Sequence, residues 1–153
     1  MTRYCTGVRV LWYWAPPFLW AAAILWASGD SFSTGATGGW MERVLGPALA
    51  PAANITIRKL AHLIEYAILA LLVWRAIEAE LKHPERRRLT LIVTPMLATL
   101  AVAVTDEVLQ GLSRTRSGSL WDVLLDVTGG ALALAIVTRL SRRRRMHSGS
   151  PAR

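Results

Sequence analysis

Residues 60–77 read LAHLIEYAILALLVWRAI, an apolar stretch long enough for one helix to cross a lipid bilayer. The stretch nevertheless carries His62 and Glu65. Ionisable side chains that face lipid are costly, so within a span they usually face the inside of a bundle and mark a site. We therefore expect residues 60–77 to form a spanning helix whose polar face has a function.

Three further apolar segments, residues 10–27, 89–109 and 120–140, are each close to the ~20 residues that a spanning helix needs. The chain of 153 residues is 53% hydrophobic, and its charges are confined to short clusters. We predict an all-α, polytopic membrane protein: a four-transmembrane-helix bundle that forms a single domain over residues 1–153, with a basic tail at 141–153. Residues 40–45 are expected to form a short interfacial helix in the first extracytoplasmic loop; the alternative is an unstructured connector.

Positive charges predict the orientation of the chain. Arg and Lys are concentrated before the first span, between the second and third spans, and after the fourth. Because basic residues favour the cytoplasmic side, we expect a bacterial inner-membrane protein with both termini in the cytoplasm. A cleaved secretory signal is the competing interpretation of residues 10–27, and its removal would not reorient the other spans. The arginines at 142–145 form a short run without interleaved aromatic residues, so we expect no nucleic-acid partner.

In this orientation, polar residues from three spans fall at a similar depth near the outer leaflet. Many of them are three or four residues apart, which places them on common helical faces. Gly129 and Gly130 on the fourth span would let a neighbouring helix approach closely. The residues that we expect to meet in one pocket are Arg58, Lys59, His62, Glu65, Tyr66, Asp106, Glu107, Gln110, Arg116, Asp122 and Asp126.

A cluster of carboxylates in a low-dielectric environment must share protons, pair with cationic side chains or hold a cation. A divalent cation is therefore one alternative for the counter-charge in this pocket. The sequence contains no zinc-protease HExxH pattern, and its one cysteine, Cys5, gives no thiolate motif. The identity of any cofactor stays open at this stage.

Two motifs resemble those of a known family. Residues 58–66 are similar to the RKxxHxxEY signature of VanZ-like membrane proteins, and residues 106–122 are similar to their DExxQxxxxxRxxxxxD signature. Gly129 and Gly130 match the glycines that follow, and a loose serine-rich match lies at Ser28, Ser31 and Ser33. The chain departs from the family at residues 114–115, Arg-Thr in place of Pro-Gly, and at Asp126, where Asn is usual. The resemblance implies an association with low-level resistance to the glycopeptide teicoplanin.

Three functions are compatible with this pattern. In the first, arginine and lysine bind the phosphate or carboxylate of an envelope lipid, a lipid-linked wall precursor or a glycopeptide, with Arg58, Lys59, Tyr66, Glu107, Gln110, Arg116 and Asp126 as ligand-binding residues. In the second, the protein is an intramembrane hydrolase or transferase whose catalytic residues are His62, Glu65, Asp106 and Asp122. In the third, the charges only fix the helices in register. A transporter of four spans without an inverted repeat would require a homo-oligomer.

Overall fold

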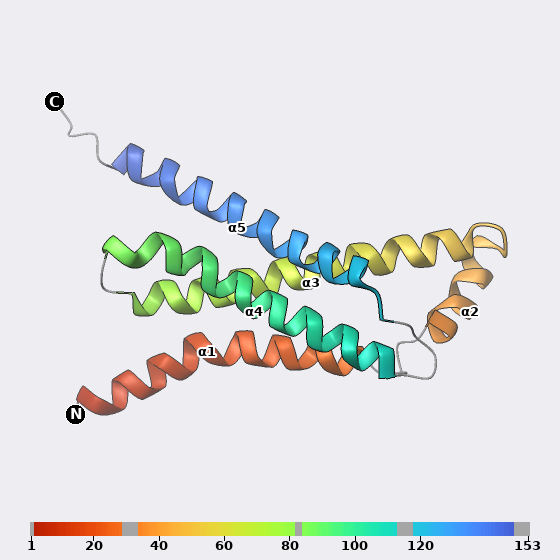
Figure 1. The fold of residues 1–153 in the computed structure, drawn as a ribbon, viewed down its shortest axis with the longest axis horizontal. Helices are drawn as coiled ribbons and strands as arrows, with labels where there is room; N and C mark the ends of the chain where they lie inside the picture. The colour runs from red at the N-terminus through yellow and green to blue at the C-terminus, as the bar shows by residue number, and fades with distance from the viewer. Residues whose placement is uncertain (1, 29–33, 82–83, 113–117, 149–153) are drawn as a thin grey trace.

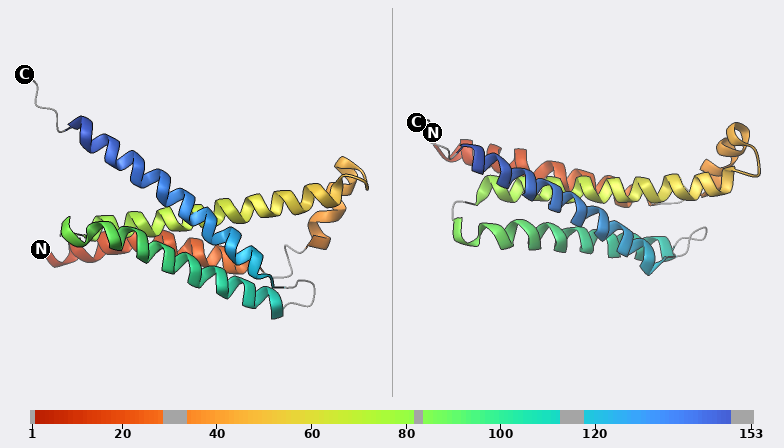
Figure 2. Two further views of the ribbon diagram at one scale, coloured as in Figure 1. Left: turned by 45° about the horizontal axis from the view of Figure 1, so that its top comes forward. Right: turned by 90° about the horizontal axis from the view of Figure 1, so that it is seen from above.

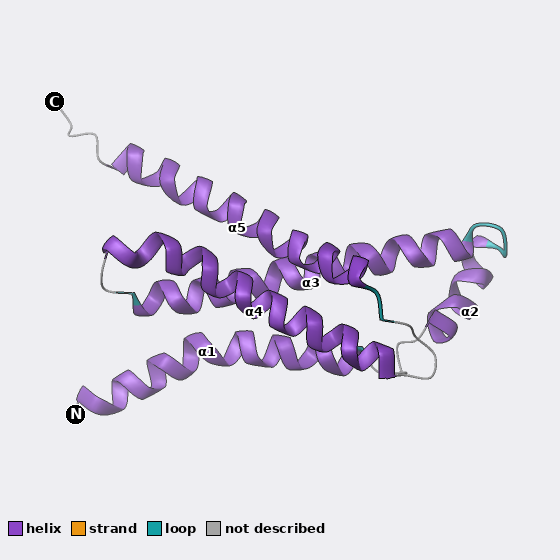
Figure 3. Cartoon of the chain, viewed as in Figure 1, coloured by secondary structure: helices purple, strands orange, loops and turns teal. Residues whose placement is uncertain are grey.

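The computed structural model describes residues 2–28, 34–81, 84–112 and 118–148. These residues form five α-helices and no β-strand: α1 (Thr2–Ala27), α2 (Thr34–Leu45), α3 (Ala50–Glu80), α4 (Pro84–Leu112) and α5 (Leu120–Ser148) (Figures 1 and 3). Helices α1, α3, α4 and α5 are long and apolar enough to cross a membrane. The predicted all-α architecture with four spans is therefore confirmed, and a short helix lies between the first two spans.

The central helix of the bundle is α3, because α1, α2, α4 and α5 all pack against it. Its buried side chains recur at the spacing of one side of a helix: Tyr66, Leu69, Val73 and Ile77. The helix begins at Ala50 instead of at residue 60, the predicted start of the span. Its 31 residues extend about 46 Å, well beyond the ~30 Å of a hydrocarbon core. Arg58 and Lys59 therefore lie on a continuous helix and not on a loop.

The start of α1 and the end of α5 lie at one end of the bundle, together with the end of α3 and the start of α4 (Figure 1). The opposite end carries α2, the end of α4 and the start of α5 (Figures 1 and 2). Helix α5 starts beside α3 and diverges from the other helices toward its C-terminal end (Figure 2). An even number of spans requires the termini to share one side, and the arrangement agrees with this. The assignment of that side to the cytoplasm stays a prediction.

Helix α2 packs against α3 at the end of the bundle opposite the termini. Of the large apolar side chains at the C-terminal end of this helix, Met41 is buried, whereas Trp40, Val44 and Leu45 are exposed. Amphipathic helices with exposed apolar and aromatic residues lie favourably in the headgroup region of a membrane. The exposed residues of α2 favour the predicted interfacial position.

A pair of glycines sets the distance between α3 and α5. A Cβ atom added at Gly129 would overlap the backbone carbonyl of Leu63 on α3. At Gly130, the added atom would lie 3.1 Å from Thr99 Cγ2 on α4 and 3.4 Å from Ala70 Cβ on α3. The backbone of α5 can approach α3 this closely because residue 129 has no side chain.

Replacing Gly129 by alanine is expected to lower the free energy of unfolding by about 1–3 kcal/mol, the usual cost of overpacking a close interface. Gly39→Ala is the matched control, because a Cβ atom at Gly39 on α2 would meet no atom within 4 Å. Unfolding in mixed micelles by titration with SDS measures both variants. Equal stability of Gly129→Ala and Gly39→Ala would contradict the close approach of α5 to α3.

Candidate functional site

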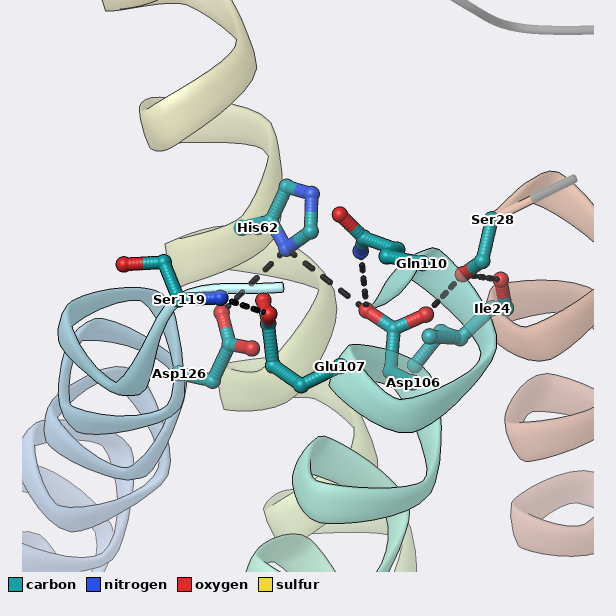
Figure 4. Close-up of polar contacts among 8 residues, drawn as sticks. All are labelled: Ile24, Ser28, His62, Asp106, Glu107, Gln110, Ser119 and Asp126. Carbon is teal, nitrogen blue, oxygen red and sulfur yellow. Dashed lines mark hydrogen bonds and ion pairs between the residues drawn. The ribbon is translucent and has the colours of Figure 1, made fainter. Parts of the chain in front are cut away.

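Three helices each present one polar residue to the interior at the same level of the bundle. Asp106 lies six residues before the end of α4 at Leu112, and Asp126 lies six residues after the start of α5 at Leu120. At 1.5 Å per residue, both carboxylates lie about 9 Å below the ends of their helices. His62 of α3 faces them, on the side of the helix that continues through Tyr66 (Figure 4).

These three side chains form a carboxylate–histidine cluster, defined here as His62, Asp106 and Asp126. His62 Nδ1 lies 3.3 Å from Asp126 Oδ1 and 4.0 Å from Asp106 Oδ2. Both aspartate side chains are 0% exposed, and the histidine side chain is 20% exposed. The second ring nitrogen of His62 points away from the two carboxylates (Figure 4). The cluster is therefore a buried acidic centre with one imidazole at its edge.

Asp106 also connects the cluster to α1 and to the end of α4. The Ser28 hydroxyl, directly after α1, donates a hydrogen bond to Asp106 Oδ1 and lies 2.9 Å from the Ile24 carbonyl oxygen. Gln110 Nε2 donates to Asp106 Oδ2 at 3.0 Å. The four-residue spacing of Asp106 and Gln110 predicted this second contact, because it places both on one helical face. Ser28 was not among the predicted site residues, and its only signal in the sequence was the loose serine match.

Asp126 has a different environment from Asp106. Among the described residues, neither oxygen of its carboxylate has a hydrogen-bond donor, although both oxygens are buried. Its nearest polar neighbour is His62 Nδ1. A buried carboxylate without donors is costly unless a proton or a cation balances its charge.

The neighbouring acid Glu107 contacts the residues that precede α5. Its Oε2 accepts a hydrogen bond from the backbone N–H of Ser119, just before α5 (Figure 4). Gly118 lies against the same residue, since a Cβ atom there would be 2.7 Å from the Glu107 carbonyl oxygen. Glu107 therefore anchors the start of α5, a role that its position in the motif did not predict.

A pocket of about 160 Å³ opens beside the cluster. It shares His62 and Gln110 with the network around Asp106, and it adds cationic, acidic and apolar side chains from α3 and α5. Its lining residues are Ile55, Arg58, Lys59, His62, Gln110, Asp122 and Leu125. The pocket brings together five of the predicted site residues, and two of them, His62 and Gln110, also contact the buried carboxylates.

The remaining predicted residues lie outside the pocket lining. Tyr66 is fully buried, and its ring stacks beside that of His62 with 6.4 Å between the ring centroids. Its hydroxyl has no hydrogen-bond partner of good geometry among the described residues. Glu65 is partly buried, and its backbone carbonyl accepts a hydrogen bond from Trp20 Nε1 at 2.9 Å. Arg116, together with Ser31 and Ser33, lies outside the described residues.

The geometry permits three kinds of chemistry. The pocket can hold an anionic group between Arg58 and Lys59. His62 can exchange a proton with either aspartate, because its Nδ1 lies 3.3 Å from Asp126 Oδ1 and 4.0 Å from Asp106 Oδ2. The cluster can also hold a metal ion, since one ligand atom from each of its three residues lies within 4.8 Å of the others.

Comparison with known proteins identifies one family. The VanZ/LLP1 family model matches residues 14–141, which include all the residues of the pocket and of the cluster. Neither a curated relative nor a solved structure matches the chain. The family match agrees with the resemblance of the two sequence motifs, which contribute most of the pocket lining.

Proposed function

The chain belongs to the VanZ/LLP1 family of multi-pass membrane proteins, and from this premise we propose that its pocket binds the anionic headgroup of an envelope lipid or a lipid-linked wall precursor. The binding would occur in the outer leaflet. Through such a ligand the protein would contribute to low-level teicoplanin resistance, the role that the family resemblance implies. The single observation that carries the proposal is the pocket beside the carboxylate–histidine cluster.

The charges of the pocket suit a phosphate-bearing headgroup. Arg58 and Lys59 line one side on α3, and Asp122 and Gln110 line another. A guanidinium meets a phosphate or carboxylate through two parallel hydrogen bonds, and an ammonium adds a point charge. The acid and the amide can accept and donate hydrogen bonds to sugar hydroxyls or amines. The lining therefore fits a headgroup that combines an anion with polar substituents.

The size of the pocket favours a headgroup over a whole glycopeptide antibiotic. Its volume is about 160 Å³, whereas pockets that enclose drug-sized ligands measure about 300–1,000 Å³. Leu120, Trp121 and Leu124 at the start of α5 are exposed apolar side chains. They would contact lipid, so the tails of a bound lipid can stay in the bilayer while only its headgroup enters the pocket.

Removing both cations of the pocket with the double variant Arg58→Gln/Lys59→Gln is expected to weaken binding of lipids with an anionic headgroup roughly tenfold to thirtyfold. Each basic side chain near an anionic headgroup contributes about 1 kcal/mol, and 1.4 kcal/mol corresponds to a tenfold change in affinity. Native mass spectrometry of the protein in detergent, titrated with phosphatidylglycerol and with an undecaprenyl diphosphate lipid, measures the change. Phosphatidylcholine, whose headgroup has no net charge, serves as the reference lipid.

Arg75→Gln is the matched control for this experiment. Arg75 is an exposed cation on the same helix, 5.2 Å from the ring centroid of Tyr13 and far from the pocket. The control should bind both anionic lipids as tightly as the unaltered chain. Equal binding by the double variant and the control would contradict the headgroup proposal. In cells, the double variant should also lose any protection against teicoplanin that the unaltered chain confers.

A further inference from the structure

The carboxylate–histidine cluster has an unbalanced charge. Asp106 and Asp126 are both fully buried, and the single imidazole of His62 contacts both of them. A protonated His62 would balance one carboxylate and leave the other uncompensated. An isolated buried charge costs several kcal/mol, so the structure requires a further positive charge at this position, which is either a proton or a cation.

Asp126 is the position in the cluster where the further positive charge is missing. Both of its carboxylate oxygens are buried without a hydrogen-bond donor among the described residues, and one of them faces His62 Nδ1 across 3.3 Å. Asp106, in contrast, accepts hydrogen bonds from Ser28 and Gln110. One oxygen of Asp126 faces His62 Nδ1, so this carboxylate borders the space among the three side chains (Figure 4).

The distances fit a common central ion. Nitrogen and oxygen ligands bind a small divalent transition metal at about 2.1 Å, so any two of them lie at most about 4.2 Å apart. The distances from His62 Nδ1 to the two aspartates, 3.3 and 4.0 Å, lie below this limit. All three ligand atoms lie within 4.8 Å of one another, so a small inward movement completes the geometry.

We propose that His62 Nδ1, Asp106 and Asp126 bind a divalent transition-metal ion, Mn²⁺ or Zn²⁺, through one imidazole nitrogen and two carboxylate oxygens. A neutral imidazole, two carboxylates and a divalent cation have zero net charge, the state that a low-dielectric environment favours. Imidazole selects against Mg²⁺ and Ca²⁺, and the two carboxylates suit Mn²⁺ and Zn²⁺. The site goes beyond headgroup binding, and its occupancy does not depend on a lipid.

The neighbouring pocket gives the ion a route of entry and a free coordination position. His62 belongs to both the cluster and the pocket lining, and Gln110 joins the pocket to Asp106. Three protein ligands leave at least one position open on a tetrahedral ion, as in catalytic zinc sites. A water molecule or a phosphate oxygen that enters through the pocket can occupy that position.

Manganese binding to the purified, tag-free protein tests the site without any lipid. After treatment with EDTA and removal of the chelator, Mn²⁺ titration followed by electron paramagnetic resonance should give one bound ion per chain. Electron spin-echo modulation should show one coupled imidazole nitrogen. Asp126→Asn, which keeps the size of the side chain, should weaken Mn²⁺ binding tenfold or more. Removing a residue that only hydrogen-bonds a metal ligand already weakens metal binding by about tenfold, and loss of a ligand should cost at least as much.

Glu78→Gln is the control, because it removes one carboxylate from α3 at the opposite end of the helix. It should retain one Mn²⁺ ion with unchanged affinity. Two results would overturn the metal site: absence of a coupled nitrogen in the unaltered protein, or equal Mn²⁺ affinity in Asp126→Asn and Glu78→Gln. Either result would leave a proton as the counter-charge. The spectroscopic result needs no variant, so a misfolded variant would not leave the question open. If the unaltered protein binds Mn²⁺ but none of the anionic lipids, the headgroup proposal alone is contradicted.

Discussion

Replacing His62 by alanine is expected to lower the free energy of unfolding by about 3–5 kcal/mol, because breaking a buried charged network costs this much. The change removes the imidazole that Asp106 and Asp126 both contact, and it leaves two carboxylates fully buried. Titration with SDS in metal-free mixed micelles measures the loss and excludes the contribution of a bound ion. No other single substitution in the cluster removes its imidazole.

A double-mutant cycle separates this charge effect from a general loss of packing. In the background Asp126→Asn, one buried charge is already absent, so His62→Ala should cost less than in the unaltered chain. A coupling of about 1–3 kcal/mol is expected for residues in direct contact. Lys59→Ala is the control, because it removes an exposed cation from the same helix and exposed charges contribute within about 0.5 kcal/mol. Purely additive effects of the two cluster substitutions would contradict a direct interaction between His62 and Asp126.

The four long apolar segments of the sequence were sufficient to predict that the chain has four helices able to span a membrane. The segment 89–109 agrees with the apolar part of α4, and 120–140 agrees with that of α5. The start of α3 could not be predicted from hydropathy, since Arg58 and Lys59 interrupt the apolar run without interrupting the helix. Hydropathy identifies only the apolar part of a helix, and α3 extends beyond its apolar part.

The sequence predicted several residues that the structure brings together at one level of the bundle, but not the partners of each residue. Asp106 and Glu107 are adjacent in the sequence, yet one faces His62 and the other accepts a hydrogen bond from the Ser119 backbone. Their roles depend on the rotation of α4 about its axis, which packing against α1, α3 and α5 determines. Ser28 joins Asp106 across the interface of α1 and α4, so no local spacing in the sequence could reveal that contact.

The side of the membrane to which the pocket opens decides whether the pocket can bind its proposed ligand. The lining residues lie at the end of the bundle opposite the chain termini (Figure 1). If the termini are cytoplasmic, as the distribution of basic residues predicts, the pocket opens toward the cell exterior. Only then can it reach lipids or wall precursors in the outer leaflet.

Accessibility of cysteines introduced at the two ends of the bundle tests this account most directly. Cys5 is the only native cysteine, so Cys5→Ser provides a background in which Lys59→Cys marks the pocket and Arg143→Cys marks the end of α5. The account predicts that a membrane-impermeant maleimide labels position 59 in intact spheroplasts and labels position 143 only after permeabilisation. Labelling of position 143 in intact spheroplasts, with position 59 protected until permeabilisation, would place the pocket on the cytoplasmic side and contradict the account.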